Sequence, residues 1–288
     1  MKHLIYYGYS LAWKIIRLLP ESFAYSLGDR LAMRIYQKNG KGVKRLRSNY
    51  SRVSSALPSD QIELLVREGM RSYLRYWVDT FRFPTWSKER TISTVICENE
   101  DFLRDPIAAG RGCIVALPHA GNWDHAGAYF CSTGIPLTTV AEHLEPEKLF
   151  RRFLAFRQAI GMEVLDLNTR AVAVLAQRLR AGKLVALVAD RDLSQSGLPV
   201  RFCNGEAKMP AGPAILAIQT GAPLITAFVK YEGRGIRIIF DREIPVPDSG
   251  SVSEKAQIMT QAMADIFAKR IGQSPTDWHM LQRIWIDE

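Results

Sequence analysis

The sequence predicts an α/β fold in which a central mixed sheet is flanked by helices on both faces and preceded by a helical N-terminal elaboration. From residue 91 onward, short apolar segments alternate with amphipathic ones, as strands and helices do around a buried sheet. Before that point, apolar residues recur at helical spacing up to about Trp86. The chain contains no internal repeat, low-complexity tract or linker. We therefore expect one domain over residues 1–288, with a helical part at 1–90 and an α/β core at 91–288.

The N-terminal part is predicted to contain helices over Phe23–Tyr36 and Ile62–Phe83. The first twenty residues are apolar but include Lys14 and Arg17, and Pro20 ends them. This stretch is short and charged for a membrane-spanning helix. Two interpretations stay open for it: an amphipathic segment at a membrane interface, and an ordinary helix packed on the core.

A basic cluster separates these two predicted helices. Gly40 and Gly42 lie within it and would let the segment conform to a charged surface. We interpret the cluster as a contact for anionic lipid, worth on the order of 1 kcal/mol per cation; a solvated loop and helix face is the alternative. The cations are Lys38, Lys41, Lys44, Arg45, Arg47 and Arg52.

In the α/β part, apolar runs predict seven strands and the segments between them predict helices. The expected strands are Thr94–Glu98, Cys113–Leu117, Leu137–Val140, Met162–Leu165, Val185–Val188, Leu224–Lys230 and Gly235–Phe240. The expected helices are Trp123–Ser132, Pro146–Ile160, Ala171–Ala181, Pro213–Thr220 and Ser253–Ile271.

A histidine directly follows one of these buried strands. Pro118 closes the strand, His119 comes next, and Asn122 is a candidate N-cap for the following helix. Asp124 in the first helical turn could bond one ring nitrogen of His119, which would leave the other nitrogen free to accept a proton. Asp190 follows the Val185–Val188 strand, and if the two strands are neighbours it emerges at the same edge of the sheet. Either carboxylate could therefore orient the histidine.

The segment Leu117–Asp124 carries an H-x4-D pattern, and in this longer form the chain resembles the membrane-associated glycolipid acyltransferases of the lipid A (lauroyl/myristoyl) type. Within them it is most similar to those that act on phosphatidylinositol mannosides. Further segments match in the same order along nearly the whole chain: Arg151–Phe153 with Arg157, Ala189–Ser194 with Ser196 and Gly197, Met209–Ala214, and Asp277–Gln282.

The resemblance implies transfer of a long acyl chain, palmitoyl being our expectation, from acyl-CoA to a mannose hydroxyl of a phosphatidylinositol mannoside. A lipid A precursor is the alternative acceptor. Because a thioester is already activated, the reaction needs a general base and oxyanion stabilisation, without a covalent enzyme intermediate. We expect no cofactor and no metal. The implied catalytic residues are His119, Asp124 and Asp190; the acyl-CoA-binding residues are His119, Arg157, Ser196 and Gln219; the acceptor-binding residues are Asp124, Arg191 and His279.

The composition of the chain indicates which kind of partner it binds. The chain has 38 Lys and Arg against 29 Asp and Glu, a formal net charge of +9, which favours an anionic partner. We see no recognised nucleic-acid-binding module, so we expect an anionic membrane surface and no nucleic acid. The four cysteines lack metal-binding spacing, which is typical of free thiols in a reducing compartment. We therefore expect a peripheral protein on the cytoplasmic face of the plasma (inner) membrane.

Two other classes of function stay open from the residues alone. A metal-dependent hydrolase could use His119, Asp124, His125 and Asp190 as a His/carboxylate ligand set. A non-catalytic lipid-binding protein would share the basic N-terminal part but would have no use for an oriented histidine.

Overall fold

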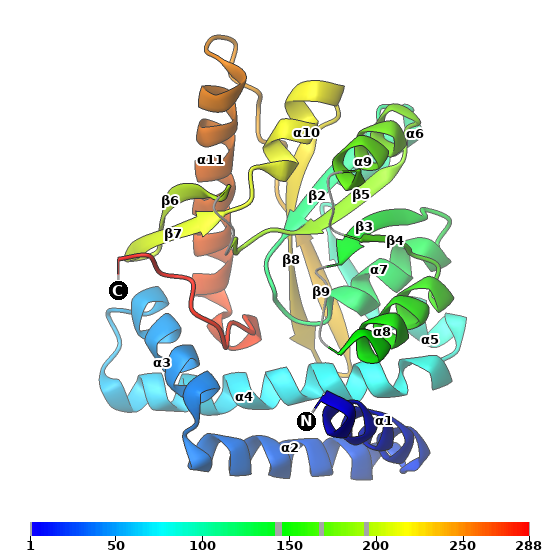
Figure 1. Ribbon diagram of the computed structural model, residues 1–288, viewed down its shortest axis with the longest axis vertical. Coiled ribbons are helices and arrows are strands. Elements are labelled where there is room, and N and C mark those ends of the chain that lie inside the picture. The colour runs from blue at the N-terminus through cyan, green and yellow to red at the C-terminus, as the bar shows by residue number, and fades with distance from the viewer. Residues whose placement is uncertain (1, 142–145, 167–169, 193–195, 288) are drawn as a thin grey trace.

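A seven-stranded mixed sheet lies at the centre of the structure, with helices on both faces (Figure 1). The computed structural model describes residues 2–141, 146–166, 170–192 and 196–287. The strand order is β1-β9-β8-β2-β5-β3-β4, and neighbours are parallel except for the antiparallel pair β8 and β9. The predicted fold class is confirmed.

The sheet contains β1 (Val95–Glu98), β2 (Cys113–Leu117), β3 (Leu137–Ala141), β4 (Glu163–Asp166), β5 (Leu184–Val188), β8 (Leu224–Glu232) and β9 (Gly235–Phe240). A separate antiparallel hairpin consists of β6 (Leu198–Phe202) and β7 (Gly205–Met209). The helices are α1 (Lys2–Leu18), α2 (Glu21–Lys38), α3 (Lys41–Val53), α4 (Ser59–Arg82), α5 (Lys88–Ser93), α6 (Asp101–Ala108), α7 (Trp123–Ser132), α8 (Glu147–Ala159), α9 (Ala171–Arg180), α10 (Gly212–Thr220) and α11 (Val252–Gln273), with short 3-10 turns η1 (Phe83–Thr85) and η2 (Pro275–Asp277).

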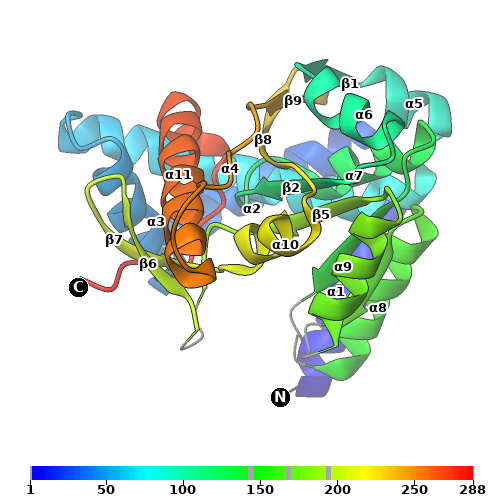
Figure 2. The same cartoon turned by 90° about the horizontal axis from the view of Figure 1, so that it is seen from above.

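The apolar side chains of the central strands fill two cores, one on each face of the sheet. In β2, Ile114 and Ala116 pack with α9, α10 and α11, whereas Val115 and Leu117 pack with α6 and α7. Figure 2 shows α9 and α10 on one side of β2 and β5, and α6 and α7 on the other. All five residues of β2 are buried. A strand covered on both faces has a continuous apolar sequence, which is why these strands could be predicted.

All seven predicted strands of the sheet and all five helices predicted in the α/β part are present, with ends shifted by at most two residues. The β6–β7 hairpin was not predicted, nor were α5 and α6. The sequence does carry a signal for the hairpin: Asn204-Gly205 stands between alternating apolar residues.

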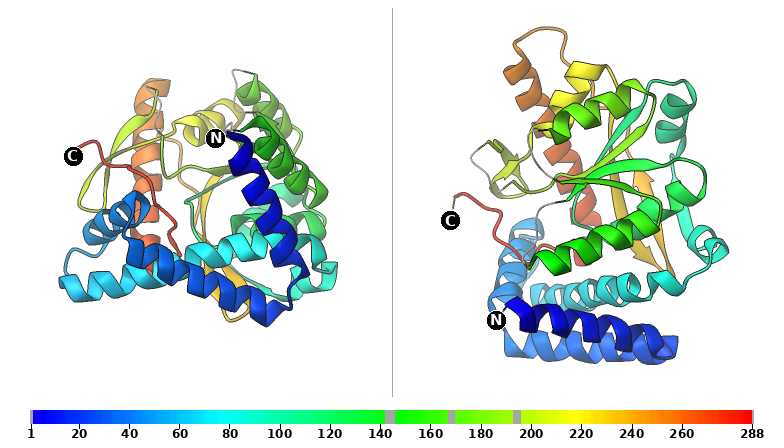
Figure 3. Two further views of the ribbon diagram at one scale, coloured as in Figure 1. Left: turned by 60° about the horizontal axis from the view of Figure 1, so that its bottom comes forward. Right: turned by 45° about the vertical axis from the view of Figure 1, so that its right-hand side comes forward.

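The N-terminal helices form a layer that α4 joins to the rest of the molecule. Helices α1 and α2 both pack on α4, and they lie on its outer side (Figures 1 and 3). An aromatic cluster fixes α1 to α4 and α8, because Trp13 contacts both Phe81 and Phe153. In the described part of the chain, no helix combines the length and the apolar character needed to cross a membrane.

Several large apolar residues of α1 and α2 nevertheless face outward. Burial and exposure alternate at helical spacing, so that Trp13 and Ile16 pack inward while Leu11 and Ile15 are exposed. Among the side chains of these two helices that the structure describes, the large apolar ones that are exposed are Tyr7, Leu11, Ile15, Leu18, Phe23, Leu27 and Leu31, which we call the apolar face.

The basic cluster does not form the conformable segment that its glycines suggested, because most of it belongs to α3. Leu46 and Tyr50 of this helix are fully buried, and Asn49 donates to the carbonyl of Met280 at 2.7 Å. Two of the cations have protein partners: Arg47 binds Glu63, and Arg52 binds Asp287 at 2.7 Å. The side chains of Lys38, Lys41 and Lys44 are exposed.

Candidate active site

His119 and Asp190 meet at the edge of the sheet where β2 and β5 end. The two strands are parallel neighbours in a register that pairs Leu117 with Val188, so each polar residue lies two positions beyond its strand. Nδ1 of His119 lies 2.6 Å from Oδ1 of Asp190, and the backbone N–H of His119 donates to Oδ2 at 3.0 Å. Of the two candidate carboxylates, Asp190 is therefore the one that contacts the imidazole.

The Asp190 carboxylate is ionised although it is fully buried. Burial by itself would raise its pKa, but the electrostatic interaction with the His119 ring and hydrogen bonds from His119 and Trp278 lower the pKa below its usual value. The indole N–H of Trp278 donates to Oδ2 at 2.8 Å. An ionised carboxylate at Nδ1 requires the ring proton there, which leaves Nε2 of His119 as the proton acceptor. The His119 side chain is 32% exposed, so the ring can be reached from outside.

A tight turn holds His119 between the strand and α7. Gly121 has φ +56°, and a Cβ there would lie 2.6 Å from the carbonyl oxygen of Val229, so only glycine fits. Asn122 then caps α7, as predicted: its side chain accepts from the backbone N–H of His125 at 2.9 Å. The turn and the cap together fix the direction in which the chain leaves His119.

Asp124 has different partners from those of Asp190. Arg157 of α8 donates from Nε to Oδ1 of Asp124 at 2.8 Å, and the hydroxyl of Tyr76 on α4 donates to Oδ2 at 2.9 Å. Burial disfavours the charge of Arg157, but Asp124 and its hydrogen bonds offset this and raise the Arg157 pKa. Tyr76 also stacks on Trp123, with ring centroids 4.3 Å apart. The ring of Trp123 in turn stands edge-on to that of His119, at 5.6 Å.

An apolar cavity lies between α7 and the sheet. Side chains of β2, β3, β5, β8, β9 and α7 line it, and Trp123, Asp124 and Arg157 border it as well. It contains about 660 Å³ of atom-free space, including the part open to solvent. Gly127 lines the cavity one helical turn beyond Trp123, and a Cβ there would lie 2.2 Å from Cε of Met162. The cavity is therefore an apolar space that adjoins the ring packed on His119.

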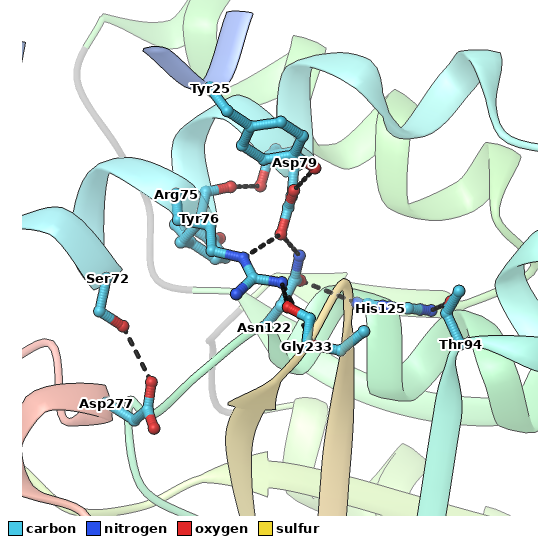
Figure 4. A network of polar contacts seen from close by, with 12 residues as sticks. Tyr25, Ser72, Arg75, Tyr76, Asp79, Thr94, Asn122, His125, Gly233 and Asp277 are labelled. Atoms are coloured by element: carbon cyan, nitrogen blue, oxygen red, sulfur yellow. Dashed lines mark hydrogen bonds and ion pairs between the residues drawn. The ribbon is translucent and has the colours of Figure 1, made fainter. Parts of the chain in front are cut away.

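His279 lies behind His119 in a second polar cluster. Its backbone N–H donates to the carbonyl of His119 at 2.8 Å, and its Nε2 lies 2.9 Å from the hydroxyl of Ser72. Ser72 donates to Asp277 at 2.9 Å (Figure 4). Burial lowers the pKa of His279 to about 3 and raises that of Asp277 to about 6, so His279 is neutral at physiological pH. The T-shaped contact of His279 with Tyr73, at 5.8 Å, places it among aromatic rings.

The side chain of His125 faces α5 rather than His119, Asp124 or Asp190. Its Nε2 lies 3.0 Å from the carbonyl of Thr91 and 3.4 Å from the hydroxyl of Thr94 (Figure 4). Burial lowers its pKa to about 4. Among the residues that the structure describes, no three His, Cys, Asp or Glu side chains cluster as metal ligands would. The ligand set considered for a metal-dependent hydrolase is therefore not assembled, because His125 faces α5.

A buried network supports the same turn from the side of α4 (Figure 4). Asp79 is 2% exposed and accepts from the hydroxyl of Tyr25 at 2.5 Å and from the side-chain amide of Asn122 at 3.4 Å. Arg75 lies 3.9 Å from Asp79 and donates to the carbonyl of Gly233 at 3.0 Å. Asp79 thus links α2 and α4 to the residue that caps α7.

The remaining predicted site residues are Arg191, Ser196 and Gln219. Arg191 contacts the side chain of Gln282, beside the C-terminal segment. Ser196 is exposed and begins the stretch that leads into β6; Leu193 and Ser194, which belong to the matched segment before it, lie outside the described residues. Gln219 is exposed at the end of α10, just before β8, whose Leu224 pairs with Ile114 at the start of β2. It therefore lies at the opposite edge of the sheet, and the structure does not bring it to His119.

Two contacts of the site were missed from the sequence. Tyr76 lies on a predicted helix far from His119 along the chain, and nothing in its local sequence marks it. Trp278 lies within the matched Asp277–Gln282 segment, but nothing in that segment marks it as a partner of Asp190. It is fully buried, so it does not offer its ring to a ligand, and its N–H is used by Asp190.

Comparison with known proteins shows that the chain matches acyltransferases along most of its length. The family model described as bacterial lipid A biosynthesis acyltransferase matches residues 1–286. The chain is 42% identical to a phosphatidylinositol mannoside acyltransferase of Mycolicibacterium smegmatis, over 97% of this chain and 90% of the relative. It is 38% identical to a protein of the same name from Mycobacterium tuberculosis strain H37Rv, over 97% of this chain and 88% of the relative.

Proposed function

The chain belongs to the bacterial lipid A biosynthesis acyltransferase family, and we propose that it transfers a palmitoyl chain from acyl-CoA to a mannose hydroxyl of a phosphatidylinositol mannoside. His119 is the general base. The observation that carries this proposal is the 2.6 Å contact between His119 and the buried Asp190. Trp123 connects that pair to the apolar cavity, because its ring packs on His119 and also borders the cavity.

The reaction follows from the orientation of the ring. Nδ1 of His119 keeps its proton in the hydrogen bond to Asp190, and Nε2 takes the proton of the attacking mannose hydroxyl. The hydroxyl oxygen adds to the thioester carbonyl carbon and forms a tetrahedral intermediate. When this intermediate collapses, the C–S bond breaks and the imidazolium returns its proton to the departing CoA thiolate. The products are the ester and free CoA, and the enzyme is unchanged.

Residues that border the apolar cavity are suited to the acyl donor. An apolar cavity suits the fatty chain, since burial of each methylene contributes about 0.8 kcal/mol. Arg157 borders this cavity and carries a positive charge, so we assign it to the thioester end of acyl-CoA, where negative charge develops. Ser196 follows the Asp190 loop and is proposed as a further donor contact. We leave Gln219 out of the proposed site because of its place at the opposite edge of the sheet.

The acceptor is proposed to bind next to His119. Asp124, Arg191 and His279 remain its proposed contacts, since a sugar with several hydroxyls is bound by carboxylates, guanidinium groups and imidazoles. Of these, Arg191 is partly exposed, whereas Asp124 and His279 are buried. Arg191 is therefore the most accessible of the three proposed contacts.

The substrates are lipids, and the outward apolar face of α1 and α2 supports attachment to a membrane. Exposed apolar patches on a protein mark sites of interaction, and Lys14 and Arg17 of α1 are exposed beside this one. We propose that the protein binds peripherally to the anionic cytoplasmic face of the plasma (inner) membrane through this face.

A lipid A precursor is the second candidate acceptor, and the family description favours it. It would use the same base and the same cavity. The two acceptors differ in headgroup, so only a direct comparison separates them. A lipid-binding protein without activity would bind the same glycolipids and leave them unchanged.

The test is an acceptor panel. Purified protein is incubated with palmitoyl-CoA and, in turn, a phosphatidylinositol mannoside, a Kdo-lipid A precursor and phosphatidylinositol, and the products are weighed by mass spectrometry. We expect a palmitoyl mass increment on the mannoside alone. A mass increment on the Kdo-lipid alone would make that lipid the acceptor in place of the mannoside. If the protein binds vesicles but no lipid gains mass, a lipid-binding protein without activity is favoured.

A further inference from the structure

The two oxygens of the Asp190 carboxylate have different partners. Oδ1 faces Nδ1 of His119 at 2.6 Å. Oδ2 accepts from the indole N–H of Trp278 at 2.8 Å and from the backbone N–H of His119 at 3.0 Å. A carboxylate held by two N–H groups at one oxygen cannot rotate without breaking charge-assisted hydrogen bonds. The contacts at Oδ2 therefore determine where Oδ1 points.

Trp278 is itself held against the turn that carries His119. Ala120 and Trp278 form an antiparallel bridge. On its two sides, the N–H of Gly121 donates to the carbonyl of Asp277 at 2.9 Å, and that of His279 donates to His119 at 2.8 Å. The hydroxyl of Tyr50 donates to the carbonyl of Trp278 at 3.0 Å. The C-terminal segment thus runs beside the His119 turn and delivers the indole to Asp190.

We propose that Trp278 is a positioning residue of the His119–Asp190 pair: its N–H fixes the carboxylate in the orientation that holds the imidazole. The catalytic consequence rests on the proposed function, in which His119 is the base. The orientation itself does not, and it can be measured without any acyl transfer.

The chain provides a matched control. Trp285 is 2% exposed and, like Trp278, packs on Phe202, with ring centroids 5.7 Å apart against 5.8 Å. Within the described residues, however, the indole N–H of Trp285 has no acceptor. Trp278→Phe and Trp285→Phe therefore each replace a buried indole with a phenyl ring, but only the first removes a hydrogen bond to Asp190.

Kinetics separate the two variants. A hydrogen bond to a charged group is worth about 1.5–3 kcal/mol, so Trp278→Phe should lower kcat by about 10- to 100-fold. The KM values should change little, because Trp278 is buried and touches neither substrate. Trp285→Phe should stay within about threefold of the parent. In the Asp190→Asn background the effect of Trp278→Phe should vanish; an equal loss in both backgrounds would overturn the proposal.

A spectroscopic test does not need an active enzyme or a folded Trp278 variant. In protein labelled with ¹⁵N-tryptophan, Asp190→Asn should move the indole N–H resonance of Trp278 and leave that of Trp285 in place. An unmoved Trp278 resonance would overturn the proposal, even if His119 proved to be the base. Conversely, a moved resonance together with full activity of His119→Ala would uphold the orientation and refute the proposed function.

Discussion

The guanidinium of Arg157 donates to Asp124 at 2.8 Å, and this contact joins α8 to the first turn of α7. Tyr76 adds α4 to the same carboxylate, through its hydroxyl at 2.9 Å. Asp124 therefore anchors three helices next to the apolar cavity, while Asp190 orients the imidazole. The two carboxylates that the sequence left in competition thus have separate structural roles.

Removing the cation of this pair should destabilise the protein. The Asp124 side chain is 3% exposed, so Arg157→Gln leaves a buried carboxylate without its counter-charge. Breaking such a pair costs about 3–5 kcal/mol, and we expect the lower end because Arg157 is 20% exposed. Urea denaturation measures the change in the free energy of unfolding.

Arg178→Gln is the matched control for that experiment. Arg178 also binds a carboxylate with two nitrogens, but its partner Glu163 is 40% exposed. Exposed pairs contribute about 0–1 kcal/mol. Equal losses of stability in the two variants would contradict a special role for the Asp124–Arg157 pair.

The length of the transferred chain should depend on Gly127. A side chain at this position points at Met162 and takes space from the cavity that we assign to the fatty acid. Gly127→Val should therefore lower kcat/KM for palmitoyl-CoA by about tenfold or more. The value for decanoyl-CoA should fall much less, because the shorter acyl chain still fits the reduced cavity. Competition between the two donors, followed by mass spectrometry, gives the ratio directly.

Gly272→Val controls for the cost of valine in a helix. Gly272 lies in α11, and a Cβ there meets nothing within 4 Å. This variant should keep the parent preference. A donor preference that stays unchanged in Gly127→Val would place the acyl chain elsewhere.

Asp277 should make stability depend on pH. Its pKa is raised from 3.8 to about 6 by burial, so between these values the folded protein holds a proton that the unfolded chain has released. Unfolding then releases a proton, and stability falls as pH rises through this window. Asp277→Asn cannot ionise and should gain up to about 3 kcal/mol on the parent between pH 4 and pH 7. The buried His279 has the opposite dependence, but both proteins contain it.

The measurement is the free energy of unfolding of both proteins across that pH range. Asp265→Asn, at an exposed carboxylate of α11, should show a difference from the parent that is nearly constant with pH. If the Asp277→Asn difference is equally constant, the carboxyl is not held protonated in the folded state.

Membrane attachment should depend on the apolar face of α1. Leu11 and Leu18 are 60% and 74% exposed, and burial of such side chains in a bilayer interface gives about 1–2 kcal/mol each. Replacing both with serine should weaken binding to anionic vesicles at least about tenfold in a flotation assay. Val252→Ser with Ile258→Ser, at α11 residues 54% and 55% exposed, should bind like the parent. Equal losses in the two double variants would remove the apolar face from the proposed contact.

Much of the sheet could be predicted because its strands are buried on both faces and read as apolar runs. The place of His119 and Asp190 also followed from the sequence, since each comes after such a run and β2 and β5 are neighbours. The choice between Asp190 and Asp124 could not be made, because it depends on register. The pairing of Leu117 with Val188, which sets the two residues level, has no signature in either strand.

Other parts of the site depend on contacts between distant segments. Tyr76 reaches Asp124 from α4, and Trp278 reaches Asp190 across 88 positions of sequence. Local periodicity carries no information on such pairs. Gln219 illustrates the reverse case: the resemblance implies it as an acyl-CoA contact, but the parallel topology carries the end of α10 to the far edge of the sheet.

The central claim is that His119 acts as the base, and the initial rate of radiolabelled palmitate transfer by His119→Gln tests it most directly. His125→Gln, at a buried histidine that faces Thr91, is the control for loss of an imidazole. Loss of the general base from an oriented pair should lower the rate by at least about 10²- to 10⁴-fold, while His125→Gln should keep most of the activity. A folded His119→Gln protein that transfers palmitate at the parent rate would contradict the account.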